Sequence, residues 1–169
     1  TYVLTSRIYE RDAGWGAVAT VGDAGVSSTA GISVGADFAM RVVAAFTLGG
    51  EPSKHVWVSR SDGDAGWGSP VPIEANDAGN ASTPVVAVSP GGAATIVWVQ
   101  SNGAGDHVWA ARFDTDGGVS SPEVIDAPMD GGAKIAKVAG DNAENVVAVW
   151  RNTPGAQGLW WNRRAGTRR

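Results

Sequence analysis

Three kinds of side chain that could bind a ligand recur along this sequence at one interval. A tryptophan pair, an arginine pair and a histidine pair each occupy positions 52 residues apart. An indole ring can stack on the C–H face of a sugar, and arginine and histidine side chains supply directional hydrogen bonds. This set predicts a carbohydrate-binding surface rather than a reaction centre. The candidate ligand-binding residues are Trp15, Trp67, Arg60, Arg112, His55 and His107.

Most of these residues also have a structural interpretation. Regularly spaced aromatic side chains can fill the gaps between packed sheets. We expect that role for the tryptophans at positions 57, 98, 109 and 150, and exposure for Trp15 and Trp67, which lie next to turns. The two histidines are too few for a catalytic zinc site, which usually takes three protein ligands. We therefore expect no metal there and predict that both histidines satisfy loop backbone groups.

Two acidic turns could bind calcium. The pairs Asp62/Asp64 and Asp114/Asp116 both belong to an Asp-x-Asp-x-Gly pattern. Alternating carboxylates suit a hard cation, but the twelve-residue loop with its terminal glutamate is absent. Asp and Gly also favour a hairpin turn by themselves. The sequence favours the turn and predicts no cofactor, with calcium at these pairs as the alternative.

Catalysis is not expected. Glu74 and Glu123 occupy nearly equivalent positions in the repeat described below, and repeat-equivalent residues usually serve structure. The chain has two tyrosines, both near its start, and no carboxylate pair at a spacing typical of glycoside hydrolysis. We expect no catalytic residues, and the glycine-rich stretches are interpreted as turns rather than phosphate-binding loops.

An internal repeat organises the whole chain. The repeats cover approximately 7–59, 60–111 and 112–162; residues 1–6 end a preceding repeat, and 163–169 form a basic tail or the start of a next one. We treat 1–169 as a single repeat domain. The repeat is anchored by four arginines, Arg7, Arg60, Arg112 and Arg163. Three further columns support it: Trp57, Trp109 and Trp161; Phe46, Trp98 and Trp150; Trp15, Trp67 and Val119.

Each repeat is predicted to form four short β-strands. In the second repeat they cover 84–88, 94–99, 107–111 and 119–125, each bounded by Gly, Pro, Asn or Asp. The second strand of each repeat is almost continuously apolar, which indicates that both of its faces are covered. Sheets stacked on one another satisfy this, as in a β-propeller. The chain begins with strands at 2–7 and 15–21 and holds about three blades. Three blades form an incomplete ring unless another chain or a longer parent completes it. A β-trefoil is the alternative fold.

Composition narrows the function classes. The chain has 169 residues, 24 Gly, 8 Trp, no Cys and a net charge of −4. This composition excludes a helical bundle, disulfides and thiol chemistry. Mild acidity argues against nucleic acid as the main partner, and no apolar run is long enough for a membrane span. The expected partners are a glycan or protein ligand, together with self-association or the remainder of a longer propeller.

The residues after the third strand of each repeat resemble the Asp-box of bacterial secreted, sialidase-like β-propellers. Its pattern is Ser-x-Asp-x-Gly-x-Thr-Trp. Asp62 and Trp67 match it, whereas Arg60 replaces the Ser and Asp64 the Gly; in the third repeat Asp114 matches. In that family the box aids folding and is not catalytic. The chain also resembles propeller lectins, some of which assemble rings from short chains.

These resemblances imply a secreted or cell-surface, non-catalytic module that binds a glycan through pockets between blades or through loops 47–54, 76–83, 100–106, 128–134 and 151–157. The alternatives are a structural protein–protein interaction module of a larger surface protein and a partial blade set of a sialidase-like hydrolase.

Overall fold

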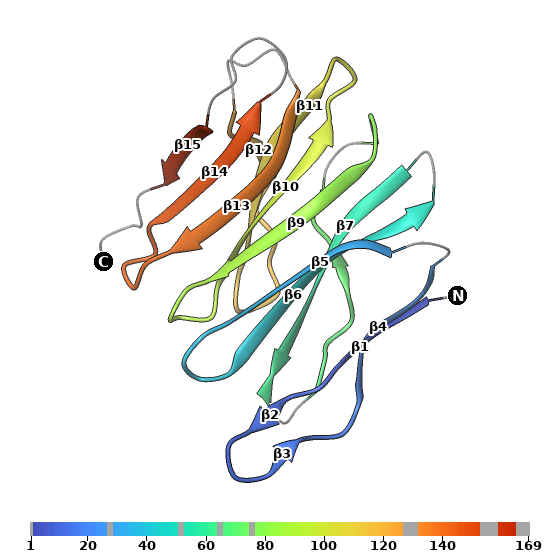
Figure 1. The fold of residues 1–169 in the computed structure, drawn as a ribbon, viewed down its shortest axis with the longest axis vertical. Coiled ribbons are helices and arrows are strands. Elements are labelled where there is room, and N and C mark those ends of the chain that lie inside the picture. Colours follow the sequence, from blue (N-terminus) through green and yellow to red (C-terminus); the bar gives the residue numbers. More distant parts are fainter. Residues whose placement is uncertain are drawn as a thin grey trace.

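The computed structural model describes residues 2–26, 29–50, 53–63, 66–74, 77–126, 132–152 and 159–164. Asp64, the tail from 165 onward, and parts of the loops 47–54, 76–83, 128–134 and 151–157 lie outside the described residues, as does the Trp161 side chain. The described residues form antiparallel β-strands and no α-helix, which confirms the all-β prediction (Figure 1). In this part of the chain there is accordingly no apolar helix of membrane-spanning length.

Two four-stranded sheets have their strands in simple sequence order. The first contains β5 (Thr29–Ala36), β6 (Arg41–Gly50), β7 (Ser53–Asp62) and β8 (Val71–Pro72). The second contains β9 (Ala81–Val88), β10 (Ala94–Ser101), β11 (Asp106–Phe113) and β12 (Glu123–Val124). The expected sequence of four strands per repeat is therefore present in both.

Smaller sheets flank this pair. A C-terminal sheet contains β13 (Ala133–Gly140), β14 (Val146–Asn152) and β15 (Leu159–Arg164). At the other end, β1 (Tyr2–Ser6) pairs with β4 (Ala19–Val26), and a small hairpin is formed by β2 (Tyr9–Glu10) and β3 (Gly14–Trp15). The strands predicted at 2–7 and 15–21 are thus present, but the second is split into β3 and β4.

The last strand of each four-stranded sheet is much shorter than predicted. The expected strand at 119–125 is reduced to an isolated bridge at Val119 and the two residues of β12. Proline lacks the N–H that a sheet ladder requires, and Pro122 interrupts this segment. Pro70 and Pro72 occur in the corresponding segment of the first sheet. The outer edge of each sheet is therefore held by only a few ladder bonds.

The sheets stack face to face, and alternate residues of a middle strand enter different cores. In β10, Ile96 and Trp98 pack into the core shared with the first sheet, whereas Val97 belongs to the core shared with the C-terminal sheet. In β6, Val43 faces the second sheet, and Phe46 faces the β1/β4 pair. Because side chains alternate between the faces of a strand, a continuous apolar run is needed to supply both cores. The prediction of two covered faces is confirmed for β6 and β10 but is wrong for β14, where Val147 is 38% exposed and the buried face carries Ala148 and Trp150.

Backbone pairing confirms the column of Trp15, Trp67 and Val119. These residues pair with Tyr9, Ser61 and Phe113 respectively, always six positions earlier. The next residue in each case donates its backbone N–H to a carbonyl oxygen: Gly16 to Ile8 at 2.9 Å, Gly68 to Arg60 at 2.8 Å and Ser120 to Arg112 at 2.9 Å. Ile8 is therefore the structural equivalent of Arg60, and the assignment of Arg7 to the arginine column is wrong by one residue.

The third repeat contains a second register difference. Phe46 pairs with Trp57 and Trp98 with Trp109, but Trp150 pairs with Trp160 rather than Trp161. The placement of Trp161 in this column is therefore wrong. The connection between the paired positions is one residue shorter in the third repeat, and a one-residue change in a hairpin shifts the whole register.

The arginine column keeps its register in the third repeat. Arg163 pairs with Val147, as Arg112 pairs with Thr95 and Arg60 with Val43. The 51-residue interval between Arg112 and Arg163 reflects the same shortened connection. The described sheets form an open stack and no closed ring.

Candidate functional site

A groove of about 360 Å³ lies between the first and second sheets, where β7 and β11 end. Its two walls come from the segment after β7 and from the turn after β11. Sequence-predicted ligand-binding residues Arg60 and Trp67 both line it, together with the acidic side chains of Asp62 and Asp116. The polar lining is extended by Ser69 and Thr115. The groove is open to solvent and large enough for a small ligand.

Trp67 is held in the groove by contacts on its other sides. Its backbone pairs with Ser61, and its indole Nε1 donates a hydrogen bond to Ser6 Oγ at 2.8 Å. The half-buried ring also packs against the core that contains Phe46 and Leu48. The indole is thereby fixed in one orientation, with part of its surface lining the groove.

Arg60 joins the two sheets beneath the groove. Its Nη1 donates to the carbonyl oxygen of Gly92 at 2.7 Å, and its Nη2 donates to that of Asp114 at 3.1 Å. The guanidinium also lies over the Phe113 ring, 5.0 Å from its centroid. Both acceptors lie in turns of the second sheet, so Arg60 connects the end of β7 to the next sheet. Arg60 therefore contributes to the groove mainly by fixing the position of the two sheets that form its walls.

Arg112 occupies the same strand position one repeat later. It contacts Asp114 Oδ1 at 2.7 Å and reaches Glu144 Oε2 of the C-terminal sheet at 3.2 Å. The hydrogen bond to Asp114 and the nearby charge of Glu144 raise the pKa of Arg112 above its ordinary value, although burial opposes this. Arg112 lines a cavity of about 10 Å³, roughly the space that one water needs. It therefore links sheets without opening a ligand-sized space beside it.

Trp15 lies apart from this groove. It is 65% exposed and contacts Tyr9 edge to face, with ring centroids 5.4 Å apart, on the β2–β3 hairpin. By contrast, Phe46, Trp98 and Trp150 are buried between sheets, as the structural interpretation predicted, and Trp57 and Trp109 are half-buried. The structure thus brings Trp67 together with Arg60 but leaves Trp15 as an isolated exposed ring.

Both histidines contact carboxylates through Nδ1. The prediction that they satisfy loop backbone groups is therefore wrong. His55 Nδ1 contacts Glu74, and His107 Nδ1 lies 3.1 Å from Asp126 Oδ1. In each case the carboxylate follows the histidine by 19 residues, across the last short strand of its sheet. The repeat equivalent of Glu74 is therefore Asp126, not Glu123 as the sequence predicted. The recurring 19-residue interval is the signal that could have revealed these pairs.

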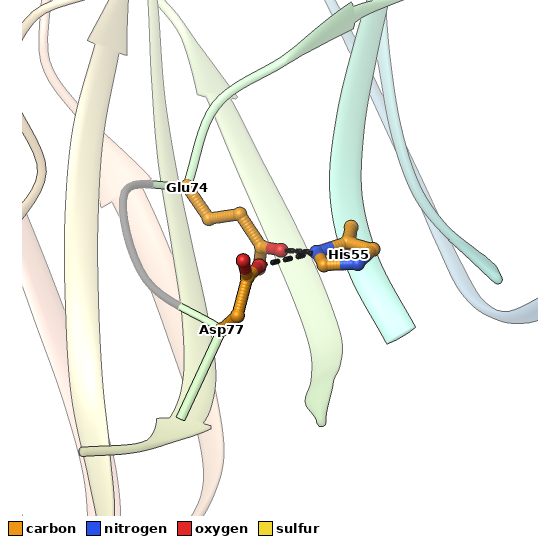
Figure 2. A group of neighbouring side chains, drawn as sticks. All are labelled: His55, Glu74 and Asp77. Atoms are coloured by element: carbon orange, nitrogen blue, oxygen red, sulfur yellow. Dashed lines mark hydrogen bonds and ion pairs between the residues drawn. The ribbon is translucent and has the colours of Figure 1, made fainter. Parts of the chain in front are cut away.

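Among the residues that the structure describes, a third donor joins only the first of these pairs. Asp77 Oδ1 lies 3.7 Å from His55 Nδ1, and the donor atoms of His55, Glu74 and Asp77 all lie within 4.8 Å of one another (Figure 2). Burial raises the pKa of Glu74, partly offset by its hydrogen bond to His55. This cluster lies at the start of β7, whereas the groove lies at its end.

The acidic side chains of the turn after β11 form hydrogen bonds within that turn and with the strand beside it. Asp116 Oδ1 accepts a bond from the Gly118 N–H at 3.0 Å, and Asp114 Oδ1 contacts the Arg112 guanidinium. These contacts favour the turn interpretation over calcium binding for this pair. The Asp62 side chain is exposed, and its proposed partner Asp64 lies outside the described residues. Among known proteins, no protein-family model matches this chain and no curated protein matches it significantly.

Proposed function

We propose that this protein is a non-catalytic recognition module that binds a carbohydrate in the groove beside Trp67. The observation that carries the proposal is the groove itself, which brings a rigidly held indole ring together with two carboxylates in a volume of about 360 Å³. Ligand sites typically have volumes of about 300–1,000 Å³. The resemblance to secreted propeller lectins supports a secreted or cell-surface location for such a module.

The groove side chains divide into two roles. The Trp67 ring offers an apolar face for the C–H groups of a sugar, while Asp62, Asp116 and Ser69 offer acceptors for its hydroxyl groups. Arg60 already donates to two backbone carbonyl groups, so it acts by holding the two sheets together at a fixed spacing. This arrangement binds a neutral or cationic sugar better than an acidic one, because the exposed side chains on the walls carry negative charge.

A glycan array followed by titration of the best ligand tests this proposal, with tryptophan fluorescence as the readout. We expect Trp67→Ala and Asp62→Ala to weaken binding at least tenfold, which corresponds to about 1.4 kcal/mol. Asp62 is exposed, so its replacement leaves the fold intact. Trp15→Ala is the matched control, since it removes an exposed indole outside the groove. The proposal fails if no glycan binds, or if Asp62→Ala binds as tightly as the unmodified protein.

We also propose that the four-stranded sheets are blades of a propeller-type ring that is completed by strands of the same repeat type. Four antiparallel strands in sequence order, with a core on both faces, are typical of a blade. On β5, Ile32 and Val34 are 57% and 63% exposed. Their equivalents on β9, Pro84 and Val86, are covered by the first sheet. The outer face of β5 therefore has the composition of an inter-sheet surface, but no inner strands of a preceding sheet cover it in the described part of the chain.

The solution mass of the chain, measured by light scattering after size exclusion, tests this second proposal. A dimer near twice 17.2 kDa is expected if two copies complete the ring. If the chain instead aggregates, and if Val34→Lys reduces that aggregation, the missing strands belong to a longer chain. The exposed face of β5 would then pair with other copies without closing a ring. A stable monomer that unfolds cooperatively contradicts the propeller proposal and favours the trefoil.

A further inference from the structure

We propose that His55, Glu74 and Asp77 bind a divalent transition-metal ion of the zinc class. The imidazole comes from the start of β7, and the two carboxylates come from the segment between β8 and β9. Figure 2 shows all three side chains converging on one point. Their donor atoms lie within 4.8 Å of one another, so a single cation can contact all three after small side-chain rotations.

The donor atoms fit zinc in number and kind, and the direct contact between His55 and Glu74 must open to admit the ion. Zinc sites with an open position commonly use three protein ligands plus water, with metal–ligand distances of about 2.0–2.2 Å. In a tetrahedral site, such distances place neighbouring donor atoms about 3.3–3.6 Å apart. The separation of 3.7 Å between His55 Nδ1 and Asp77 Oδ1 is close to that value. An imidazole donor favours zinc, nickel or copper over calcium and magnesium, which prefer oxygen.

Burial differs across the three donors in a way that suits an ion entering from solvent. The Glu74 side chain is 4% exposed, whereas that of Asp77 is 85% exposed and that of His55 lies between them. Glu74 thus forms the floor of the cluster and Asp77 its open side, where water can complete the coordination.

The second repeat provides an internal comparison. His107 and Asp126 form the same histidine–carboxylate contact, but both are buried, and Met129 takes the place of Asp77 in the repeat. The histidine–carboxylate contact therefore belongs to the repeat as a structural feature, and among the described residues the exposed third donor accompanies only the first histidine. We infer one metal ion per chain rather than one per repeat.

Titration of metal-free protein with Zn²⁺, by calorimetry and by thermal unfolding, tests this inference. We expect one zinc ion per chain, a raised unfolding temperature, and no response to Ca²⁺ at the same concentration. Asp77→Asn should weaken zinc binding at least tenfold, and His55→Gln should abolish it. Asp77 is exposed, so Asp77→Asn leaves the metal-free unfolding temperature unchanged. Co²⁺ provides a second readout, because a tetrahedral site gives it strong visible absorption.

Asp12→Asn is the matched control, since it removes another exposed carboxylate, from the β2–β3 turn. It should bind zinc like the unmodified protein. The inference is overturned if zinc fails to bind, if binding survives Asp77→Asn unchanged, or if Asp12→Asn weakens it equally. Glycan binding can be measured separately, because the groove lies at the opposite end of β7. Failure of either proposal therefore leaves the other open to its own test.

Discussion

Trp98→Ala is expected to lower the free energy of unfolding by about 3–5 kcal/mol. The Trp98 side chain is fully buried in the core between the first and second sheets. Its Nε1 donates a hydrogen bond at 2.9 Å to Oε1 of Gln100, which is also buried. Truncation therefore leaves a large cavity and removes one of the hydrogen bonds of a buried amide. Because domains are stable by only about 5–15 kcal/mol, this loss is a large part of the total.

Urea unfolding followed by fluorescence and circular dichroism measures this effect. Trp98→Phe, which keeps an aromatic ring but loses the N–H donor, should cost less than Trp98→Ala. Trp15→Ala should change stability by no more than about 0.5 kcal/mol, because it removes an exposed ring. If Trp98→Ala and Trp15→Ala had equal effects, the core between the two sheets would not be the main source of stability.

Asp37→Ala is expected to cost about 2–3 kcal/mol at pH 7, because it removes several hydrogen bonds to an ionised acceptor. The Asp37 carboxylate accepts bonds from the backbone N–H groups of Ala39 and Arg41 at 2.9 and 3.0 Å, and from Arg41 Nε at 2.7 Å. Arg41 Nη2 in turn donates to the carbonyl oxygen of Pro90 in the next sheet at 2.9 Å. One carboxylate thus fixes both the β5–β6 turn and a contact between sheets.

The same carboxylate gives a pH dependence of known sign. Burial by itself raises the pKa of Asp37, but the hydrogen bonds and charge of Arg41 offset this, and the pKa lies below its ordinary value of 3.8. A lowered folded pKa means that the unfolded chain binds more protons, so stability falls on acidification. The contribution of Asp37 is complete above its ordinary pKa and is lost as the pH falls through its folded value.

Unfolding free energies of the unmodified protein and Asp37→Asn, measured at neutral and acidic pH, test this dependence. The difference between them should shrink as the pH falls. Asp141→Asn is the matched control, because Asp141 accepts the same set of bonds in the β13–β14 turn, with Asn145 in place of Arg41. It should cost less, since Asp141 is exposed and the side chain at the position of Arg41 is the neutral amide of Asn145. Equal costs would show that the contact of Arg41 with the next sheet adds nothing.

The parts of the fold that follow from local pattern were predictable from the sequence. Continuous apolar runs such as 96–99 indicated strands with two covered faces, and the column of Phe46, Trp98 and Trp150 indicated the packing between sheets. The short outer strands were not predicted, because β-rich residues there alternate with prolines that cannot join the ladder. Whether a ring forms depends on surfaces that no local pattern describes.

Register and long-range contacts were harder to predict for a different reason. In the third repeat, the Trp column and the Arg column imply different lengths for the connection between β14 and β15. Only the backbone pairing of these two strands decides which length is right. The histidine–carboxylate pairs were missed because the acid is Glu in one repeat and Asp in the next, so no column of identical residues appears. Arg60 and Trp67 were identified, but the hydrogen bonds that commit Arg60 to the next sheet arise only in three dimensions.

The alternation of β10 side chains between two cores has a consequence for how the molecule responds to damage. In the described part of the chain, both four-stranded sheets have a neighbouring sheet on each face: the first lies between the β1/β4 pair and the second sheet, and the second lies between the first sheet and the C-terminal sheet. In such an array, stability is approximately a sum of each unit's own stability and its couplings to nearest neighbours. A substitution that disrupts one interface between sheets therefore weakens the packing of one neighbouring sheet and leaves the packing of the other unchanged. The array loses order from its ends inward, and the two four-stranded sheets, which carry the two walls of the groove, are the last to lose their supports.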